Sequence, residues 1–311
     1  MKLYALHENP EWFPPFARAF AAAGLDYEEW LLTEGTIDLD AAPPEGIFYN
    51  RLSASSHTRD HPYARDYARA VLDWLEAHGR RVVNRRSVVE MEVSKVRQLT
   101  ALRAFGIDTP RTVAVVGRSG LVAAAERFPV PFITKHNQGG KGLGVRRFDD
   151  LAGFRAYVAS DEFEEPVDGI TLLQEYVQAR APFITRIETV GYDFVYAITA
   201  DTARGGFQLC PADACELDDQ GRPVQAASLF ALREGFDHPI VGQVTAFARR
   251  HDIEVAGFEF IEAADGRVLV YDVNTNTNYN PDVEAVAPRS GPGELAAYLQ
   301  RVMVESHAVL V

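Results

Sequence analysis

The chain has 311 residues, and at about 150 residues per domain this length predicts two domains with sizeable cores and excludes a single small module. It carries 31 basic and 44 acidic residues for a net charge of −13, and 47% of its residues are hydrophobic and 24% charged, as in ordinary globular proteins. This composition disfavours a disordered chain and a nucleic-acid-binding protein, so the partner that we expect is a small molecule.

Signals for membranes or secretion are weak in this sequence. No apolar run approaches the ~18 residues of a membrane span, and the segment from His7 to Pro10 interrupts the first apolar stretch before a signal-peptide core could form. We therefore expect no membrane partner and a cytoplasmic location. The two cysteines, Cys210 and Cys215, are too few for a disulfide scaffold or a four-ligand zinc site, and we expect both to be reduced thiols.

The first ~85 residues predict a small open α/β layer built of βαβ units. Strands are expected at residues 3–6, 27–32, 46–50 and 81–84, with a helix at 12–23 that Gly24 ends and a second amphipathic helix that Gly79 ends. None of these strands is followed by a GxGxxG turn, which disfavours a dinucleotide site of the Rossmann kind.

A second unit, of α+β type, is expected to begin near residue 88. Ser87 and Glu90 have the spacing of a capping box, and apolar residues at helical spacing predict a helix that Gly106 and Pro110 end. Further strands are expected at 111–116, before Lys135, and at 144–147 and 171–176, with helices at 121–127 and 151–159. Two long strands, 184–190 and 194–200, form a candidate hairpin across Gly191, followed by a helix at 241–251 and strands at 255–261 and 268–273.

A glycine-rich loop follows the strand that ends at Lys135, with glycines at 139, 140, 142 and 144. Such a run allows backbone N–H groups to converge on an anion. It is not a Walker loop, because Gly142 stands where Ser or Thr would follow Lys141. A flexible surface loop is the alternative interpretation. Of the four lysines in the chain, three lie in or near this loop (Lys95, Lys135 and Lys141), which favours phosphate binding.

The later strands bring carboxylates together. Alternation along two paired strands would place Glu259, Asp272 and Asn274 on one face. Oxygen ligands without a nearby His or Cys are typical of a Mg²⁺ site. A solvated acidic edge is the alternative, but the apolar neighbours of Glu259 and Asp272 weaken it.

These features together resemble the ATP-grasp superfamily. The resemblance is greatest to the branch of glutamate ligases and related carboxylate–amine ligases, of the ribosomal-protein-modification type, which modify protein or peptide ends. It runs from about Ser94 to Asn280 and is carried, in order, by SKVRQLTALRAFGIDTPRT, ITKHNQGGKGLGV, LLQEYV, ITRIETVGYDFVYAI and AGFEFIE with VLVYDVNTN.

The resemblance implies an α/β unit followed by an α+β unit, that is, an ATP-grasp fold behind a small N-terminal open α/β domain. The implied division is a pre-ATP-grasp domain at 1–87, a first ATP-grasp subdomain with the phosphate loop at 88–178, and a second with the metal site at 179–311.

It also implies roles for individual residues. ATP would be bound by Lys95, Lys135, Gln138, Gly139, Gly140, Lys141, Gly142, Glu175, Tyr176 and Val177. Arg186 would act on the transferring phosphoryl group, and one or two Mg²⁺ ions would be held by Glu259, Asp272 and Asn274. The order of Glu259 and Asp272 is swapped relative to the usual Asp and Glu, which keeps charge and ligand type.

Two arginines are candidates for substrate contacts. Arg51 follows a predicted strand of the first domain, where ligands of open α/β sheets gather, and it could pair a substrate carboxylate; a surface arginine in a serine-rich loop is the alternative. Relatives place a second cation soon after the strand at 194–200, and Arg204 is the nearest candidate here.

The activity that the resemblance implies is ATP-dependent amide formation through an acyl phosphate, with release of ADP and phosphate. The expected substrates are a small-molecule or peptide carboxylate and an amine or amino acid, and a homo-oligomer is possible. Two alternatives stay open: a phosphotransferase acting on a hydroxyl, and a non-catalytic nucleotide-binding module. The lysines, Arg186 and the metal ligands argue against the module, whereas nothing in the sequence separates the ligase from the phosphotransferase as firmly.

Overall fold

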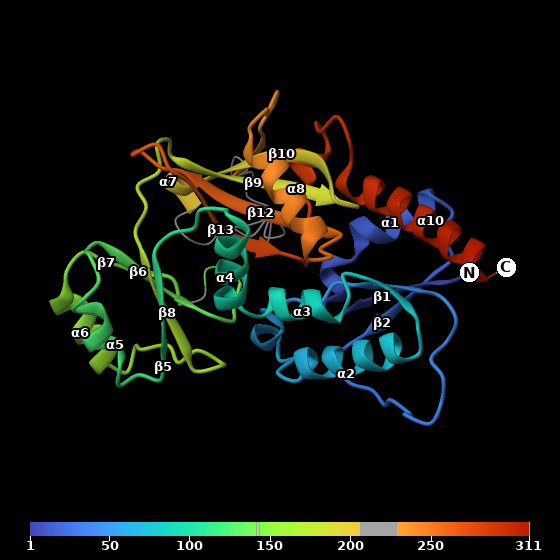
Figure 1. Cartoon of the computed structure of the whole chain (residues 1–311), viewed down its shortest axis with the longest axis horizontal. Coiled ribbons are helices and arrows are strands. Elements are labelled where there is room, and N and C mark those ends of the chain that lie inside the picture. The colour runs from blue at the N-terminus through green and yellow to red at the C-terminus, as the bar shows by residue number, and fades with distance from the viewer. Residues whose placement is uncertain (141, 143, 206–228, 311) are drawn as a thin grey trace, which may run out of the picture.

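The structure is a computed structural model that describes residues 1–140, 142, 144–205 and 229–310. Within these ranges the strands form three sheets, which follow one another along the chain (Figure 1). Cys210, Cys215 and Lys141 lie outside the described residues, and so does the side chain of Arg204, although its backbone belongs to α7 (Thr202–Gly205). No helix in the described ranges combines the length and the apolar character needed to cross a membrane.

The N-terminal sheet has the strand order β2-β1-β3-β4 and is parallel throughout. Its strands are β1 (Leu3–His7), β2 (Tyr27–Leu31), β3 (Ile47–Asn50) and β4 (Arg81–Val83). Alternate residues of β1 pack on α1 (Pro14–Ala22) and on α2 (Ala64–Ala77), so both faces of the sheet are buried. Short 3₁₀ turns, η1 (Pro10–Trp12) and η2 (Ser56–Arg59), lie in the connections that follow β1 and β3.

The helices that follow correct one prediction. Ser87 lies inside α3 (Arg86–Glu92) and caps nothing, so the predicted capping box is wrong. The side-chain cap is at Ser94, whose extended backbone lets the hydroxyl accept from the Arg97 N–H at 3.3 Å and begin α4 (Lys95–Phe105). Gly106, at φ 95°, ends α4 as expected.

The second sheet is antiparallel, with the order β5-β8-β6-β7. It consists of β5 (Thr112–Val116), β8 (Ile170–Glu175), β6 (Phe132–His136) and β7 (Arg146–Phe148). Two short helices, α5 (Leu121–Ala125) and α6 (Leu151–Ala159), pack on it around Phe132 and Phe154. The other face of β6 is therefore available to carry Lys135 toward the rest of the molecule.

The third sheet is antiparallel, with the order β11-β10-β9-β12-β13. Its strands are β9 (Phe183–Val190), β10 (Asp193–Asp201), β11 (Phe230–Leu232), β12 (Val255–Glu262) and β13 (Val268–Asn274). The predicted hairpin across Gly191 is present, and Gly191 has a φ of 59°. Helices α4 and α8 (Ile240–Arg250) share a core with this sheet.

The C-terminal part was not anticipated. After a short α9 (Pro281–Glu284), the long α10 (Gly291–Leu310) runs beside α1 and returns to the N-terminal domain (Figure 1). One hydrophobic core joins α1, α10, the N-terminal sheet and the third sheet. Of the two expected domain boundaries, the one near 178 lies between β8 and β9, whereas the one near 88 falls within α3. The division of the chain stays a prediction.

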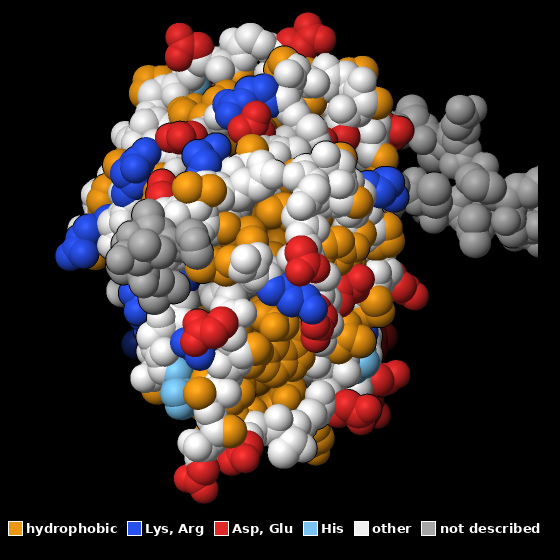
Figure 2. Space-filling model, turned by 90° about the vertical axis from the view of Figure 1, so that its right-hand side faces the viewer, with side chains coloured by type: hydrophobic (Ala, Val, Ile, Leu, Met, Phe, Trp, Pro, Cys, Tyr) orange, Lys and Arg blue, Asp and Glu red, His pale blue; other side chains and the backbone are white. Residues whose placement is uncertain are grey.

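Hydrophobic side chains gather on the side of the molecule that is turned to the viewer in Figure 2, with both acidic and basic groups among and around them. A contiguous apolar area of this kind is typical of interaction surfaces. This surface is compatible with the predicted homo-oligomer, which stays a prediction.

Asn84 fixes the N-terminal sheet to the third sheet. It is fully buried with φ 54°, and its amide nitrogen donates to the carbonyls of Val255 at 2.8 Å and Thr275 at 3.0 Å. Its amide oxygen accepts from the N–H groups of Glu254 at 3.0 Å and Val255 at 3.1 Å. One side chain thus satisfies four backbone groups that have no access to water.

Replacing Asn84 by Ala should therefore lower the free energy of unfolding by about 4 kcal/mol, because four buried backbone groups lose their partners. Asp252→Ala is the matched control, since Asp252 has nearly the same φ (55°) but is exposed. It should cost about 1 kcal/mol from backbone conformation alone. Equal losses for the two variants in urea denaturation would contradict the role of the Asn84 side chain.

Candidate functional site

A cavity of about 750 Å³ lies where the three sheets approach one another. The second sheet contributes Ile133 and Lys135, and the third contributes residues of β9, β12 and β13. The segments after β1 and β3 close it with Trp12 and Ser53–Ser55. Because carboxyl ends of parallel strands and two further sheets meet here, this is the place where a ligand would be held between the layers.

Most of the residues singled out from the sequence line this cavity: Lys95, Lys135, Gly139, Gly140, Gly142, Glu175, Tyr176, Val177, Arg186, Glu259, Asp272 and Asn274. Gln138 and Arg51 are buried but do not line it. Arg51 is only 2% exposed, so the alternative interpretation of a surface arginine is wrong, whereas the predicted substrate contact stays a prediction. Its guanidinium packs over the Phe16 ring instead, 3.8 Å from the centroid.

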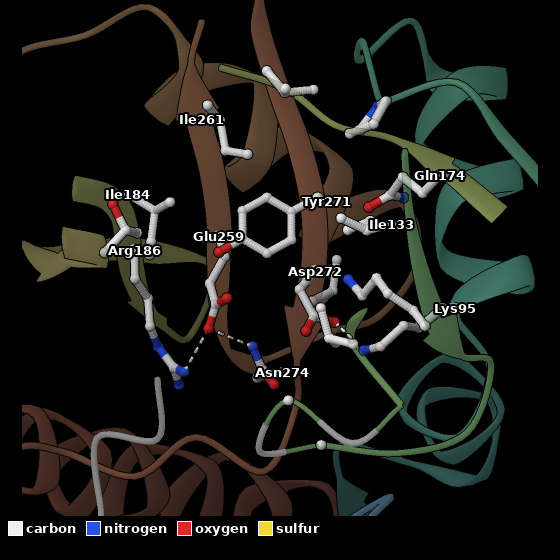
Figure 3. A pocket seen from close by; sticks show the side chains of 18 of the residues that line it. Lys95, Ile133, Gln174, Ile184, Arg186, Glu259, Ile261, Tyr271, Asp272 and Asn274 are labelled. Carbon is white, nitrogen blue, oxygen red and sulfur yellow. Dashed lines mark hydrogen bonds and ion pairs between the residues drawn. The ribbon is translucent and has the colours of Figure 1, made fainter. Parts of the chain in front are cut away.

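The carboxylates face each other across two strands. Glu259 on β12 is the register partner of Asp272 on β13, and the amide nitrogen of Asn274 donates to Glu259 Oε1 at 3.2 Å (Figure 3). In the described residues no group of three or more His, Cys, Asp or Glu side chains could hold a metal ion. The candidate metal set is therefore two carboxylates and one amide, oxygen donors that suit Mg²⁺.

Two lysines, one from α4 and one from β6, lie near these carboxylates. Lys95 Nζ, at the start of α4, pairs with Asp272 Oδ1 at 2.6 Å, and Lys135 Nζ lies 5.0 Å from the centre of the Tyr271 ring. Burial, together with the nearby charge of Lys95, lowers the pKa of Lys135 to about 8. Burial also acts to lower the pKa of Lys95, but the charge and hydrogen bond of Asp272 together with the charges of Glu92 and Glu259 outweigh it, and the net shift is upward. The two ammonium groups thus form one positive cluster.

The pKa values of the Glu259 and Asp272 carboxyl groups shift in opposite directions. Burial raises the pKa of Glu259, and the charge of Arg186 only partly opposes this. Burial also acts to raise the pKa of Asp272, but Lys95 and Lys135 outweigh it and the net shift is downward. Asp272 is therefore held as an anion by the lysine cluster.

Arg186 connects the metal set to the loop after β13. It is 4% exposed and donates to Glu188 at 2.6 Å, to Glu259 at 3.1 Å and to the Thr277 hydroxyl at 2.5 Å. Any side chain at position 257 would collide with its guanidinium, which explains the glycine on the neighbouring strand. The arginine is thus held in one orientation at the edge of the cavity.

An apolar region lies beyond the charged one. Ile133, Ile184, Ile261 and Tyr271 line the cavity between the second and third sheets (Figure 3). The segment 175–177 connects these sheets, and the Glu175 side chain is turned to Arg267 at 2.9 Å. Two apolar walls and a connecting backbone suit a planar ring such as a purine base.

The sequence interpretation did not name these apolar residues, although a signal was present. Ile133, Ile184 and Ile261 each lie two residues from Lys135, Arg186 or Glu259 on the same strand. Residues two apart on a strand share a face, so each polar assignment already implied an apolar neighbour in the cavity.

No protein-family model matches the sequence, and no curated protein matches it. Among solved structures, the chain is similar to a RimK domain ATP-grasp protein from Sphaerobacter thermophilus DSM 20745, with a TM-score of 0.66 and 16% identity over 96% of this chain and 99% of that chain. For D-cycloserine synthetase DcsG the TM-score is 0.66 and the identity 20%, over 97% of this chain and 99% of that chain. For the ATP-grasp ligase PsnB, complexed with minimal precursor, Mg and ADP, these values are 0.64 and 16%, over 96% of each chain.

This likeness extends over the N-terminal sheet as well as the two later sheets, so the chain has the ATP-grasp fold. The fold class expected from the resemblance, α/β followed by α+β, is confirmed. The expected resemblance to the ATP-grasp superfamily is likewise confirmed at the level of the fold, since the similar structures include a RimK domain ATP-grasp protein and an ATP-grasp ligase.

Proposed function

We propose that the protein is an ATP-dependent carboxylate–amine ligase that forms an amide bond through an acyl phosphate and releases ADP and phosphate. The observation that carries this proposal is the convergence of Lys95, Lys135 and Arg186 on Glu259 and Asp272 in one cavity of an ATP-grasp fold. Of the three solved structures compared above, one is a synthetase and one is an ATP-grasp ligase complexed with Mg and ADP, which supports the same choice.

The base and the phosphates of ATP would occupy different regions of the cavity. The purine would lie between Ile133, Ile184 and Ile261, with the backbone of 175–177 at its edge. The phosphates would lie toward Lys95, Lys135 and the glycine loop, because these groups supply positive charge and unobstructed N–H donors. One or two Mg²⁺ ions would be held by Glu259, Asp272 and Asn274, where they would neutralise phosphate charge.

The chemistry consists of two displacements. A carboxylate oxygen attacks the γ-phosphorus, the bond from this phosphorus to the bridging oxygen breaks, and ADP leaves with the electron pair. The amine nitrogen then attacks the acyl carbon, phosphate leaves, and the nitrogen loses a proton. Arg186 is fixed by Glu188 and Thr277, so it can stabilise the developing phosphoryl charge without reorganising. Positioning and charge therefore carry most of the catalysis.

Trapping of the acyl phosphate tests this proposal directly. With ATP, Mg²⁺ and hydroxylamine, the protein should convert one member of a panel of amino acids, short peptides and dicarboxylates to its hydroxamate, with one ADP and one orthophosphate per product. Phosphorus NMR distinguishes the alternatives. A stable phosphomonoester without hydroxamate would indicate a phosphotransferase, and pyrophosphate would indicate adenylation. The absence of nucleotide turnover with every member of the panel would contradict the proposal that the protein is an enzyme.

The proposed metal role predicts a large effect of Asp272→Asn. This change should lower kcat at least ~100-fold, because a carboxylate that holds the metal and pairs Lys95 is lost. Glu262→Gln is the matched control: Glu262 lies on β12 and pairs with Arg233 at 2.7 Å, but outside the cavity. Its activity should stay near that of the wild type. Normal turnover of Asp272→Asn at limiting Mg²⁺, measured as ADP release, would contradict the assignment.

The lowered pKa of Lys135 predicts proton uptake on ATP binding. With a pKa of about 8, Lys135 is about half neutral at pH 8, and a bound polyphosphate favours its ammonium form. About half a proton should be taken up per ATP at pH 8, and affinity should fall as the pH rises further. Calorimetry at pH 8 in two buffers of different ionisation enthalpy measures this uptake. Lys135→Arg, whose charge is permanent, should abolish it, and equal uptake in both proteins would contradict the role of Lys135.

A further inference from the structure

Glu92 is an acidic residue of the cavity that has no role in the reaction proposed above. It is the last residue of α3, is partly buried, and lines the cavity beside the segment Ser53–Ser55. Its Oε1 accepts from the Ala54 N–H at 3.1 Å, and its Oε2 accepts from the N–H and the hydroxyl of Thr275 at 2.7 and 2.9 Å. These three hydrogen bonds fix the direction of the carboxylate.

The same hydrogen bonds orient Glu92 without neutralising it. A carboxylate has about four lone-pair positions, so one position on Oε1 stays available to a ligand. All three donors are uncharged, and no ion pair in the described part of the chain includes Glu92. Lys95, whose charge acts on Glu92, is itself paired with Asp272 Oδ1 at 2.6 Å. Glu92 therefore has no cation of its own.

The electrostatic surroundings of Glu92 lead to the same conclusion. Burial raises the pKa of Glu92, and the hydrogen bonds from Ala54 and Thr275 and the charge of Lys95 only partly oppose this shift. A raised pKa of a carboxyl group means that its surroundings do not fully stabilise the negative charge. A cationic ligand beside Glu92 would supply the positive charge that these surroundings lack.

A second acceptor in the same part of the cavity also lacks a partner. Asn276 follows Thr275 in the loop after β13, lines the cavity and is 9% exposed. Its Oδ1 is buried and has no hydrogen-bond partner within the described ranges. Because a buried amide oxygen without a donor is costly, a ligand that donates to it would gain binding energy. We call Glu92 Oε1 and Asn276 Oδ1 the acceptor pair.

The acceptor pair has the chemistry to bind a cationic donor. Both atoms accept hydrogen bonds and neither donates, which disfavours a phosphate or a carboxylate at this place. A primary ammonium group combines three N–H donors with one positive charge, so it can satisfy both atoms of the acceptor pair. A metal ion is the alternative, but no group of three or more His, Cys, Asp or Glu side chains among the described residues could hold one.

We infer that Glu92 and Asn276 bind the amine substrate as its ammonium ion. This inference rests on the proposed ligase function and names the class of amine, a primary amine that is protonated when it binds. Thr275, which donates to Glu92, directly follows Asn274 of the candidate metal set. An ammonium ion held by Glu92 would therefore lie near the place where the acyl phosphate is proposed to form.

Binding of matched ligands tests the charge requirement without turnover. Alaninol, valinol and phenylalaninol are each compared with the diol that carries a hydroxyl group in place of the amine. Saturation-transfer NMR uses the full chain with Mg²⁺ and a non-hydrolysable ATP analogue, so that Mg²⁺ rather than the amine occupies Glu259 and Asp272. At least one amino alcohol should bind ~10-fold more tightly than its diol, because only the amine is positively charged.

Glu92→Gln makes the binding test specific to the acceptor pair. This change removes the charge, so affinity for the amino alcohol should fall at least ~10-fold and its preference over the diol should disappear. Glu90→Gln is the matched control, since Glu90 lies on the same helix but pairs with Arg69 at 2.8 Å and does not line the cavity. Its preference for the amino alcohol should equal that of the wild type.

Asn276→Ala gives a second test, which holds even if Glu92→Gln does not fold. The Oδ1 atom that this change removes makes no hydrogen bond within the described ranges, so the fold should be kept. Affinity for the amino alcohol should fall at least ~3-fold, because one acceptor is lost and the charge of Glu92 remains.

Two nucleophiles separate ammonium binding from activation of the carboxylate. Hydroxylamine is uncharged near neutral pH, whereas aliphatic amines are protonated. With a carboxylate that forms a hydroxamate, Glu92→Gln should lose at least ~10-fold more of kcat/KM in amide formation than in hydroxamate formation. An equal loss with both nucleophiles would assign Glu92 to the fold or to the nucleotide site and would overturn the inference.

Four binding results would also overturn the inference: no amino alcohol preferred over its diol, an unchanged preference in Glu92→Gln, an equal loss in Glu90→Gln, or unchanged affinity in Asn276→Ala. Failure of the hydroxamate assay with an intact, Glu92-dependent preference for ammonium would instead count against the ligase reaction alone. The two proposals can therefore fail separately.

Discussion

Buried charge is the constraint on which the rest of this site depends. Lys95, Lys135 and Arg186 lie within one region with Glu188, Glu259 and Asp272, and all six are largely withdrawn from water. A single buried charge is very costly, so such a cluster is tolerated only because groups of opposite sign lie beside one another. The charges come from α4, β6, β9, β12 and β13, so this balance requires all of these elements to be docked correctly. The same arrangement that binds a polyanion with its cations therefore also fixes how the sheets pack.

The N-terminus of α4 connects the second sheet to the third sheet. The Lys95 N–H donates to the carbonyl of Asn137, and the Asn137 side chain accepts from the Val96 N–H at 2.8 Å, immediately before the glycine loop. The Lys95 side chain meanwhile pairs with Asp272 on the third sheet. One helix end thus contacts both sheets between which the nucleotide is proposed to lie. A ligand that competes with Asp272 for Lys95 would therefore weaken this connection between the two sheets.

The sequence predicts best those parts of the site that depend on local periodicity. Glu259, Asp272 and Asn274 were placed on one face from alternation alone, and the short turn between β12 and β13 fixes the register that brings them together. Lys95 and Lys135 could be found because lysine is rare in this chain. Ser87 misled the capping prediction because it lies within the first turn of α3, close before α4, and only the extended backbone of Ser94 identifies that serine as the cap. The burial of Arg51 was beyond reach, since its partners at 277 and 278 are more than 220 residues away in sequence.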